Sequence, residues 1–253
     1  MSKNIAIIFA GGSGARMGTG VPKQFIEIEG KPIIIYTLEN FEDHEEIDEI
    51  YVSCIPSYIE KLEKLVKVYM ISKVVKIVPG GDTGQESIYN ALKAAYENNS
   101  AEDIVLLHDG VRPHITNELI SENIASVKNY GSAITCSEMF ETPVVSKDKQ
   151  IVDNTPHRHE LFTAQAPQSF YLGDIIGAHE SVRETNPDYV GLIDSCMLMK
   201  SLGKEVYMVK GNRGNIKVTT PEDLYLLRGL IQYRETTQAF GITENEMPKI
   251  LKK

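Results

Sequence analysis

The chain has 253 residues, of which 42% are hydrophobic, and its formal net charge is −9 at pH 7. This size permits a sizeable core within one domain. The acidic balance argues against non-specific nucleic-acid binding, which depends on Lys and Arg neutralising phosphates, and no apolar run reaches the roughly 18 residues of a membrane span. The cysteines Cys54, Cys136 and Cys196 show no metal-ligand spacing and are interpreted as reduced thiols of a cytoplasmic protein.

Apolar runs in the first half of the chain predict buried parallel strands at residues 4–9, 49–55, 74–78 and 104–108. Between them, apolar residues recur at helical spacing over residues 59–69 and 88–95. Strands that alternate with helices predict right-handed crossovers and a mostly parallel α/β sheet. In the second half we expect strands at 131–136 and 205–209, and helices at 172–184, 194–202 and 221–233, the last with Thr220 as N-cap.

The segment from residue 138 to residue 160 interrupts this pattern. It holds Pro143 and Pro156, a polar turn at 146–150 and short β-prone runs at 144–145 and 151–152. We expect a protruding β-arm with little core of its own, which packs on a partner subunit in a homodimer. The arm is interpreted as an insertion in one domain of residues 1–235, and the polar residues 236–253 as a loosely held tail.

A glycine-rich loop, AGGSGARMG from Ala10 to Gly18, follows the first strand directly. Ligands of open α/β sheets bind at the carboxyl ends of the strands, and glycines let backbone N–H groups approach phosphate oxygens. The loop matches neither GxxxxGK[ST] nor GxGxxG. Arg16 and Lys23 add two cations beside these donors, which suits a triphosphate; the alternative is a tight turn with two solvated cations.

Three later segments carry further candidate groups. A glycine turn, Gly80-Gly81-Asp82, precedes a helix opened by Glu86-Ser87, and alone it could be an ordinary strand-to-helix turn. HDGVRP places Asp109 at the end of the fourth strand, where a carboxylate can hold Mg²⁺ against phosphate oxygens; the alternative is a helix cap or a salt bridge with Arg112. NIKVTTPEDL, at residues 215–224, places Lys217 just before a capped helix.

Together AGGSGARMG, PKQF, HDGVRP and NIKVTTPEDL resemble the cytidylyltransferases that act on polyol phosphates, over about residues 4–232. The resemblance implies a Rossmann-like, mostly parallel sheet flanked by helices, of nucleotidyltransferase type, with a protruding β-arm. It also implies an enzyme in which a phosphate oxygen of a polyol phosphate attacks the α-phosphorus of CTP and pyrophosphate leaves. Mg²⁺ is the implied cofactor, and no nucleic acid or membrane is an expected partner.

Carried over residue by residue, the resemblance implies four groups of site residues. The catalytic group is Arg16, Lys23 and Lys217, and the metal ligand is Asp109. Thr142 and Arg158 of the arm would reach an acceptor phosphate in the partner subunit, and the acceptor group also includes Gln165, Asp194 and Lys217. The CTP-binding group is Ala10, Gly11, Gly12, Ser13, Gly14, Gly81, Asp82, Ser87 and Arg112.

The acceptor is the most open part of the interpretation. Gln165, the Ser169-Phe170 pair and Asp194-Ser195-Cys196 resemble the ribitol-phosphate branch of this family. The resemblance therefore favours D-ribitol 5-phosphate as the acceptor, giving CDP-ribitol for wall or capsule polymers. The alternative acceptor is 2-C-methyl-D-erythritol 4-phosphate, of isoprenoid biosynthesis. A non-catalytic nucleotide-binding homologue is less favoured, because the loop cations, Asp109 and Lys217 are all present. A hexose-1-phosphate uridylyl- or thymidylyltransferase is disfavoured by the arm and the NIKVT segment.

Overall fold

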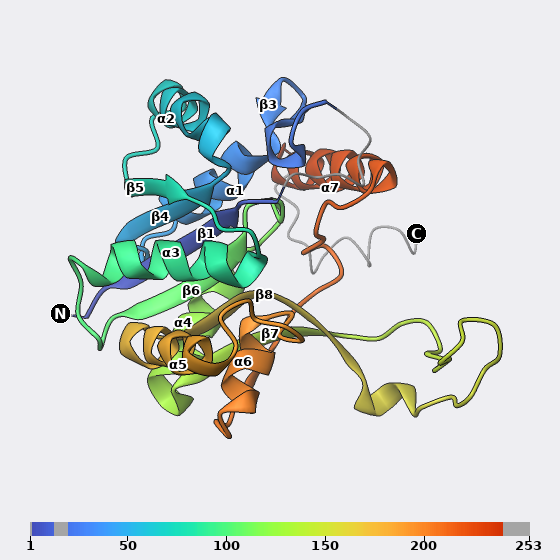
Figure 1. Ribbon diagram of the computed structural model, residues 1–253. Helices are drawn as coiled ribbons and strands as arrows, with labels where there is room; N and C mark the ends of the chain where they lie inside the picture. Colours follow the sequence, from blue (N-terminus) through green and yellow to red (C-terminus); the bar gives the residue numbers. More distant parts are fainter. Residues whose placement is uncertain (1, 13–19, 240–253) are drawn as a thin grey trace.

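The computed structural model describes residues 2–12 and 20–239 and contains one large sheet with helices on both faces (Figure 1). The seven strands lie in the order β5-β4-β1-β6-β8-β7-β9. All neighbouring pairs are parallel except those of β8, which runs antiparallel to both β6 and β7. The strands are β1 (Asn4–Ala10), β4 (Glu49–Cys54), β5 (Val74–Pro79), β6 (Ile104–Asp109), β7 (Ser132–Glu138), β8 (Phe162–Tyr171) and β9 (Met208–Lys210).

The two faces of the sheet bury separate hydrophobic cores, because successive side chains of a strand point to opposite faces. Ala6 and Ile8 of β1 lie in the core with α1 (Ile33–Glu42), α2 (Ile59–Val68) and α4 (Asn117–Tyr130). Ile5 and Ile7 lie in the other core, with α3 (Gly84–Tyr96), α5 (Leu172–Thr185) and α6 (Ser195–Ser201). The helices α1 to α6 therefore divide three and three between the faces.

A third, smaller core lies beside the carboxyl edge of the sheet. There α7 (Pro221–Ala239) packs through Leu227 and Ile231 onto Ile28 and Ile33, which belong to the short hairpin of β2 (Glu27–Ile28) and β3 (Lys31–Pro32) and to the start of α1. The described residues also contain the 3-10 turns η2 (Lys23–Phe25), η3 (Pro56–Tyr58) and η4 (Arg158–Glu160). No helix within residues 2–12 and 20–239 is long and apolar enough to cross a membrane.

The predicted parallel strands and the predicted helices are confirmed, but one strand of the large sheet and two of the helices that cover it were not predicted. Strand β8 contains Pro167, a residue more typical of loops than of central strands. Its residues 165–170 are nevertheless buried, and the strand pairs with β6 on one side and β7 on the other. Helix α1 opens with three consecutive isoleucines, which hide its helical period. Helix α4 begins at Thr116, whose hydroxyl accepts a hydrogen bond from Leu119 N and so caps it.

The segment between β7 and η4 leaves the sheet and extends away from the helices (Figure 1). It contains one isolated bridge, between Val145 and Asn154, and no strand, so the predicted β-arm is not confirmed. Phe140, Val144 and Ile151 remain exposed, and the segment has no core on which a two-stranded ribbon could be stabilised.

Candidate functional site

The segments after β1, β5 and β6 meet at the carboxyl edge of the sheet, where the segment before α7 joins them. Two cavities open there, and both are lined by Phe9, Gly84, Asp109 and Lys217. We call them the glycine-loop cavity, between the end of β1 and α3, and the β8 cavity, between α3, β8 and α6. Asp109 and Lys217 therefore stand in the wall that the two cavities share.

The glycine-loop cavity has a volume of about 190 Å³ and collects most of the predicted CTP-binding residues that the structure describes. Helix α3 presents its N-terminus to it through Thr83 and Gly84. Thr83 Oγ1 accepts from Glu86 N at 3.0 Å and caps the helix, while Glu86 Oε2 accepts at 2.8 Å from the N–H of Asp82, the residue before the N-cap. A helix N-terminus is a favourable place for an anion. The residues that line the glycine-loop cavity include Ala10, Gly11, Gly12, Lys23, Gly81, Asp82 and Ser87.

Ser87 brings the turn after β5 against the end of β1. Its Oγ accepts a hydrogen bond from Gly81 N at 3.0 Å and donates one to Thr83 O at 2.9 Å. A Cβ atom on Gly11 would lie 2.5 Å from this Oγ. Glycine at position 11 is therefore required by the close approach of β1 to the start of α3.

The turn η2 fixes the other side of this cavity. Gln24 is buried, and its Nε2 donates to Ala10 O at 2.6 Å and to Gly12 O at 3.3 Å. The neighbouring Lys23 Nζ donates to Val218 O at 2.9 Å. The PKQF segment thus holds the carbonyl groups of the glycine loop with its amide and places its ammonium group at the cavity wall.

The β8 cavity, of about 250 Å³, is lined by polar side chains of β8 and of the segment before α6. Gln168 Nε2 donates to Asp194 Oδ2 at 3.0 Å, and Gln168 Oε1 accepts from Cys196 N at 3.0 Å. Asp194 Oδ1 also accepts from Met197 N at 2.8 Å, so Asp194 is the N-cap of α6 and a wall of the cavity at once. The predicted acceptor residue Gln165 lines the same cavity.

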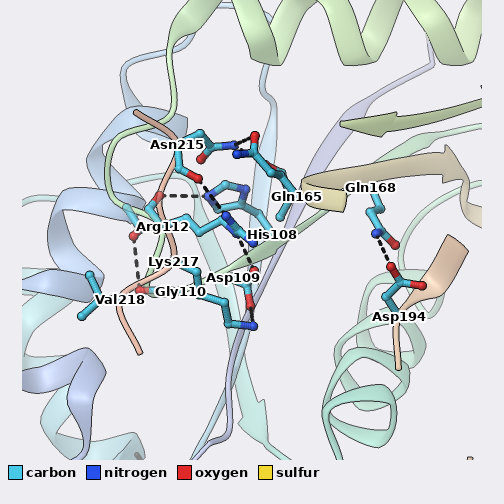
Figure 2. Close-up of polar contacts among 12 residues, drawn as sticks. His108, Asp109, Gly110, Arg112, Gln165, Gln168, Asp194, Asn215, Lys217 and Val218 are labelled. Atoms are coloured by element: carbon cyan, nitrogen blue, oxygen red, sulfur yellow. Dashed lines mark hydrogen bonds and ion pairs between the residues drawn. The ribbon is translucent and has the colours of Figure 1, made fainter. Parts of the chain in front are cut away.

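A buried carboxylate between two cations forms the shared wall (Figure 2). Arg112 Nε donates to Asp109 Oδ2 at 2.8 Å, and Lys217 Nζ lies 2.5 Å from Asp109 Oδ1. The side chain of Asp109 is 8% exposed and that of Lys217 is 41% exposed. Burial by itself raises the pKa of Asp109, but the charges of Lys217 and Arg112 outweigh it and lower the pKa to about 2. The salt bridge considered as an alternative for Asp109 is therefore present, and it leaves the carboxylate ionised.

His108 supports this cluster and carries no charge at neutral pH. Burial lowers its pKa to about 4, and its Nε2 lies 3.0 Å from Arg112 O, so this nitrogen donates to the carbonyl. His108 therefore fixes the turn after β6. At the start of α7 the Asp223 carboxylate accepts from the backbone N–H groups of Thr219 and Thr220, at 2.7 and 2.8 Å, which fixes the segment after Lys217.

The two predicted site residues of the arm, Thr142 and Arg158, do not line either cavity of their own chain. Thr142 is exposed, and Arg158, also exposed, donates from Nη1 to Phe140 O at 3.0 Å at the root of the arm. Ser13, Gly14 and Arg16 lie outside the described residues. The trans role of Thr142 and Arg158 stays a prediction.

Sequence reasoning missed several buried amides that organise the site. Gln24 and Asn215 appeared only within PKQF and NIKVTTPEDL, and Gln168 was not singled out. Each of the three makes two or more hydrogen bonds at a cavity wall or to the segments that form it. A usable signal was present, because an amide inside an apolar run must find partners when it is buried.

Comparison with known proteins agrees with this site. A family model described as IspD: 2-C-methyl-D-erythritol 4-phosphate cytidylyltransferase matches residues 4–232. A ribitol-5-phosphate cytidylyltransferase of Vibrio parahaemolyticus is 46% identical over 239 residues, which cover 94% of this chain and 100% of that protein. A 2-C-methyl-D-erythritol 4-phosphate cytidylyltransferase of Clostridium botulinum is 41% identical over 226 residues, covering 89% and 96%.

The fold agrees as well. The crystal structure of a 4-diphosphocytidyl-2C-methyl-D-erythritol synthase from Anaerococcus prevotii superposes with a TM-score of 0.79 at 28% identity, covering 91% of this chain and 96% of that one. The family match extends over both cavities and over the Asp109 cluster between them. The chain therefore belongs to the IspD family and is a cytidylyltransferase, an enzyme of the nucleotidyltransferase class.

Proposed function

We propose that this enzyme transfers a cytidylyl group from CTP to D-ribitol 5-phosphate and forms CDP-ribitol and pyrophosphate. The observation that carries the proposal is the shared wall: Asp109 and Lys217 border both cavities. A nucleotide held in the glycine-loop cavity and a polyol phosphate held in the β8 cavity would meet there. The proposal assigns the donor to one cavity and the acceptor to the other.

The proposed reaction is an in-line displacement. An oxygen of the acceptor phosphate forms a new bond to the α-phosphorus of CTP, the bond to the β-phosphate oxygen breaks, and pyrophosphate leaves with that electron pair. Because the attacking phosphate is already ionised, no general base is required, and the protein acts by positioning and charge stabilisation. Lys23 would stabilise the β- and γ-phosphates, as would Arg16, which lies outside the described residues.

Lys217 would hold the acceptor phosphate, because it lines both cavities and its side chain is 41% exposed. In the homodimer that we propose, Arg158 of the arm would reach the same phosphate in the partner subunit. Two cations on an acceptor phosphate reduce its repulsion from the triphosphate. Arg112, which lines the β8 cavity, would keep Asp109 in place.

Asp109 also fits a magnesium ion. It is an ionised hard-oxygen ligand, and Mg²⁺ is usually held by one or two carboxylates together with substrate phosphates. Within residues 2–12 and 20–239 no group of three acidic, His or Cys side chains could hold a metal alone, so phosphate oxygens would complete the ligands. When bound, Mg²⁺ would neutralise charge on the phosphates.

The choice of ribitol 5-phosphate rests on relatives and on the polar groups that β8 and the segment before α6 add to the otherwise largely apolar lining of the β8 cavity. Asp194 uses one contact on each oxygen for Met197 N and Gln168, which leaves further lone pairs for hydroxyl donors. Ribitol 5-phosphate carries one more hydroxyl group than methylerythritol 4-phosphate and lacks its methyl group. Relatives at 46% and 42% identity are ribitol-5-phosphate cytidylyltransferases. Methylerythritol phosphate remains the second candidate, because the family model and a relative at 41% identity are both named as cytidylyltransferases of 2-C-methyl-D-erythritol 4-phosphate.

Pyrophosphate release with CTP and each acceptor, measured side by side, tests the proposal. The expected result is a higher kcat/KM for D-ribitol 5-phosphate than for 2-C-methyl-D-erythritol 4-phosphate. Without an acceptor, no pyrophosphate should be released. A clear preference for methylerythritol phosphate would overturn the acceptor assignment. UTP in place of CTP, as a control, should give slower release. Sedimentation of the purified chain tests the dimer, and a monomer would remove the proposed role of Arg158.

A further inference from the structure

Asn215 lies in the segment that joins β9 to α7, two residues before Lys217. It is completely buried and does not line either cavity. A polar side chain at such a place must be satisfied by the protein itself. The partners of Asn215 therefore show which parts of the site this segment is attached to.

The carboxamide of Asn215 attaches the segment to β8. Its Nδ2 donates to Ala166 O at 2.7 Å and to Gln165 Oε1 at 3.4 Å, and Gln165 Nε2 donates back to Asn212 O at 3.0 Å. Figure 2 shows the two amides facing each other. The approach is close, since a Cβ atom on Gly211 would lie 2.5 Å from Gln165 Oε1. Side chain and backbone of the segment are thus both fixed to the acceptor-side strand.

The main chain of Asn215 connects the same point to the charged cluster. Its carbonyl oxygen accepts from Arg112 Nη1 at 2.7 Å, while Arg112 Nε binds Asp109. Lys217 binds the other oxygen of Asp109. One residue therefore links the wall of the β8 cavity to both cations on the shared carboxylate.

The orientation of the Asn215 amide is determined by its neighbours. A rotated amide would turn Oδ1 toward Ala166 O and Gln165 Oε1, which are both acceptors, so Nδ2 must face them. Oδ1 is buried and has no hydrogen-bond partner among the residues that the structure describes. Such a group costs about 1–3 kcal/mol. A residue that bears this cost while it holds two site segments together is expected to serve alignment rather than stability.

We infer that Asn215 is a positioning residue, which aligns Lys217 and Arg112 on Asp109 by clamping their segment to the acceptor wall at Gln165 and Ala166. It touches no substrate in this role. The inference rests on the proposed function, since it takes the β8 cavity as the acceptor site. Loss of the clamp displaces the Lys217 ammonium group relative to the acceptor phosphate, and misplacement by about 1 Å can cost roughly 100-fold in rate.

The test compares Asn215→Ala and Asn215→Asp with the wild type. We expect kcat/KM for the acceptor to fall roughly 10- to 100-fold in both variants, with the KM for CTP unchanged. In Asn215→Asp a protonated carboxyl can donate where the amide did, and the facing acceptors raise its pKa. The activity of Asn215→Asp relative to the wild type should therefore rise as the pH falls, whereas that of Asn215→Ala should stay level.

Asn123→Ala is the matched control. Asn123 is also completely buried, and its Nδ2 donates to Leu119 O at 2.9 Å and to Thr135 Oγ1 at 3.0 Å, away from both cavities. Urea unfolding corrects each variant for its folded fraction. A merely structural role would lower kcat through the folded fraction in all three variants and change no KM. That outcome, or equal pH profiles for the two Asn215 variants, would overturn the inference.

The same assays separate this inference from the proposed function. All kinetics are measured on whichever of the two polyol phosphates the wild type turns over. If that acceptor is methylerythritol phosphate, the assignment of ribitol fails, while a selective loss in the Asn215 variants still supports the clamp. If ribitol 5-phosphate is used and the loss is not selective, the clamp fails and the proposed function stands.

Discussion

Replacing Asp109 by Asn tests the shared wall most directly, because the change removes a charge and keeps the shape. The carboxylate is almost completely buried and binds Arg112 Nε and Lys217 Nζ at 2.8 and 2.5 Å. In Asp109→Asn the Arg112 side chain, which is only 11% exposed, loses its counter-ion. We expect both stability and turnover to fall.

The size of the stability loss follows from the pKa of Asp109. The folded protein lowers this pKa from 3.8 to about 2, and a difference of this size corresponds to about 2.5 kcal/mol at pH 7. Because the folded pKa is the lower one, the contribution is complete above pH 3.8 and is lost as the pH falls through about 2. For a chain of this length the loss lowers Tm by roughly 5–10 °C. The difference in free energy of unfolding between the wild type and Asp109→Asn should therefore shrink as the pH falls from 3.8 to about 2.

Urea unfolding and pyrophosphate release measure the two effects, and Asp103→Asn is the matched control. Asp103 precedes the same strand β6 at its opposite end, is buried, and accepts from Lys3 N and Ser100 N at 2.7 Å each. Asp103→Asn should lose stability and retain the kcat of its folded fraction. Asp109→Asn should lose at least about 100-fold in kcat after the same correction. Wild-type stability at pH 7, or wild-type kcat, in Asp109→Asn would refute the reasoning.

Three further predictions concern the glycine-loop cavity and the side of the sheet that α3, α5 and α6 cover. Lys23→Ala should lower kcat roughly 100-fold, about 3 kcal/mol, because a cation at the triphosphate is lost; near-normal steady-state turnover contradicts this. Gly11→Ala should raise the Kd for CTP in calorimetry, since its Cβ meets Ser87 Oγ at 2.5 Å; an unchanged Kd shows that the turn can shift. Burial lowers the pKa of His179 to about 3. As the pH falls, the unfolded chain therefore binds a proton on this histidine before the folded chain does, and the free energy of unfolding should fall by about 2–3 kcal/mol between about pH 6.5 and about pH 4.5. His179→Gln should weaken this dependence in a urea series, and an equal slope speaks against it.

The sequence predicted the parallel half of the fold because its strands are continuous apolar runs. Residues 4–9 and 104–108 lie in the middle of the sheet, and both of their faces are buried. The antiparallel strand β8 was not predicted, since Gln165, Pro167 and Gln168 interrupt its pattern and its burial comes from β6 and β7 on either side. The arm shows the reverse: β-prone residues such as Val144 and Ile151 form no strand, because nothing covers them.

The sequence by itself determined which chemical groups are available: a glycine loop with nearby cations, a carboxylate at the end of a strand, and a lysine before a capped helix. Because the loop and the carboxylate directly follow predicted strands, the sequence predicted that both would lie at the carboxyl edge of a parallel sheet. The lysine was assigned to the same site by the resemblance. Only the tertiary structure decided that Asp109 and Lys217 share one wall between two cavities. It also decided that Asn215 joins that wall to β8. The physical reason is that these contacts link residues far apart in sequence, and a hydrogen bond or an ion pair depends on distances that only the packed sheet fixes.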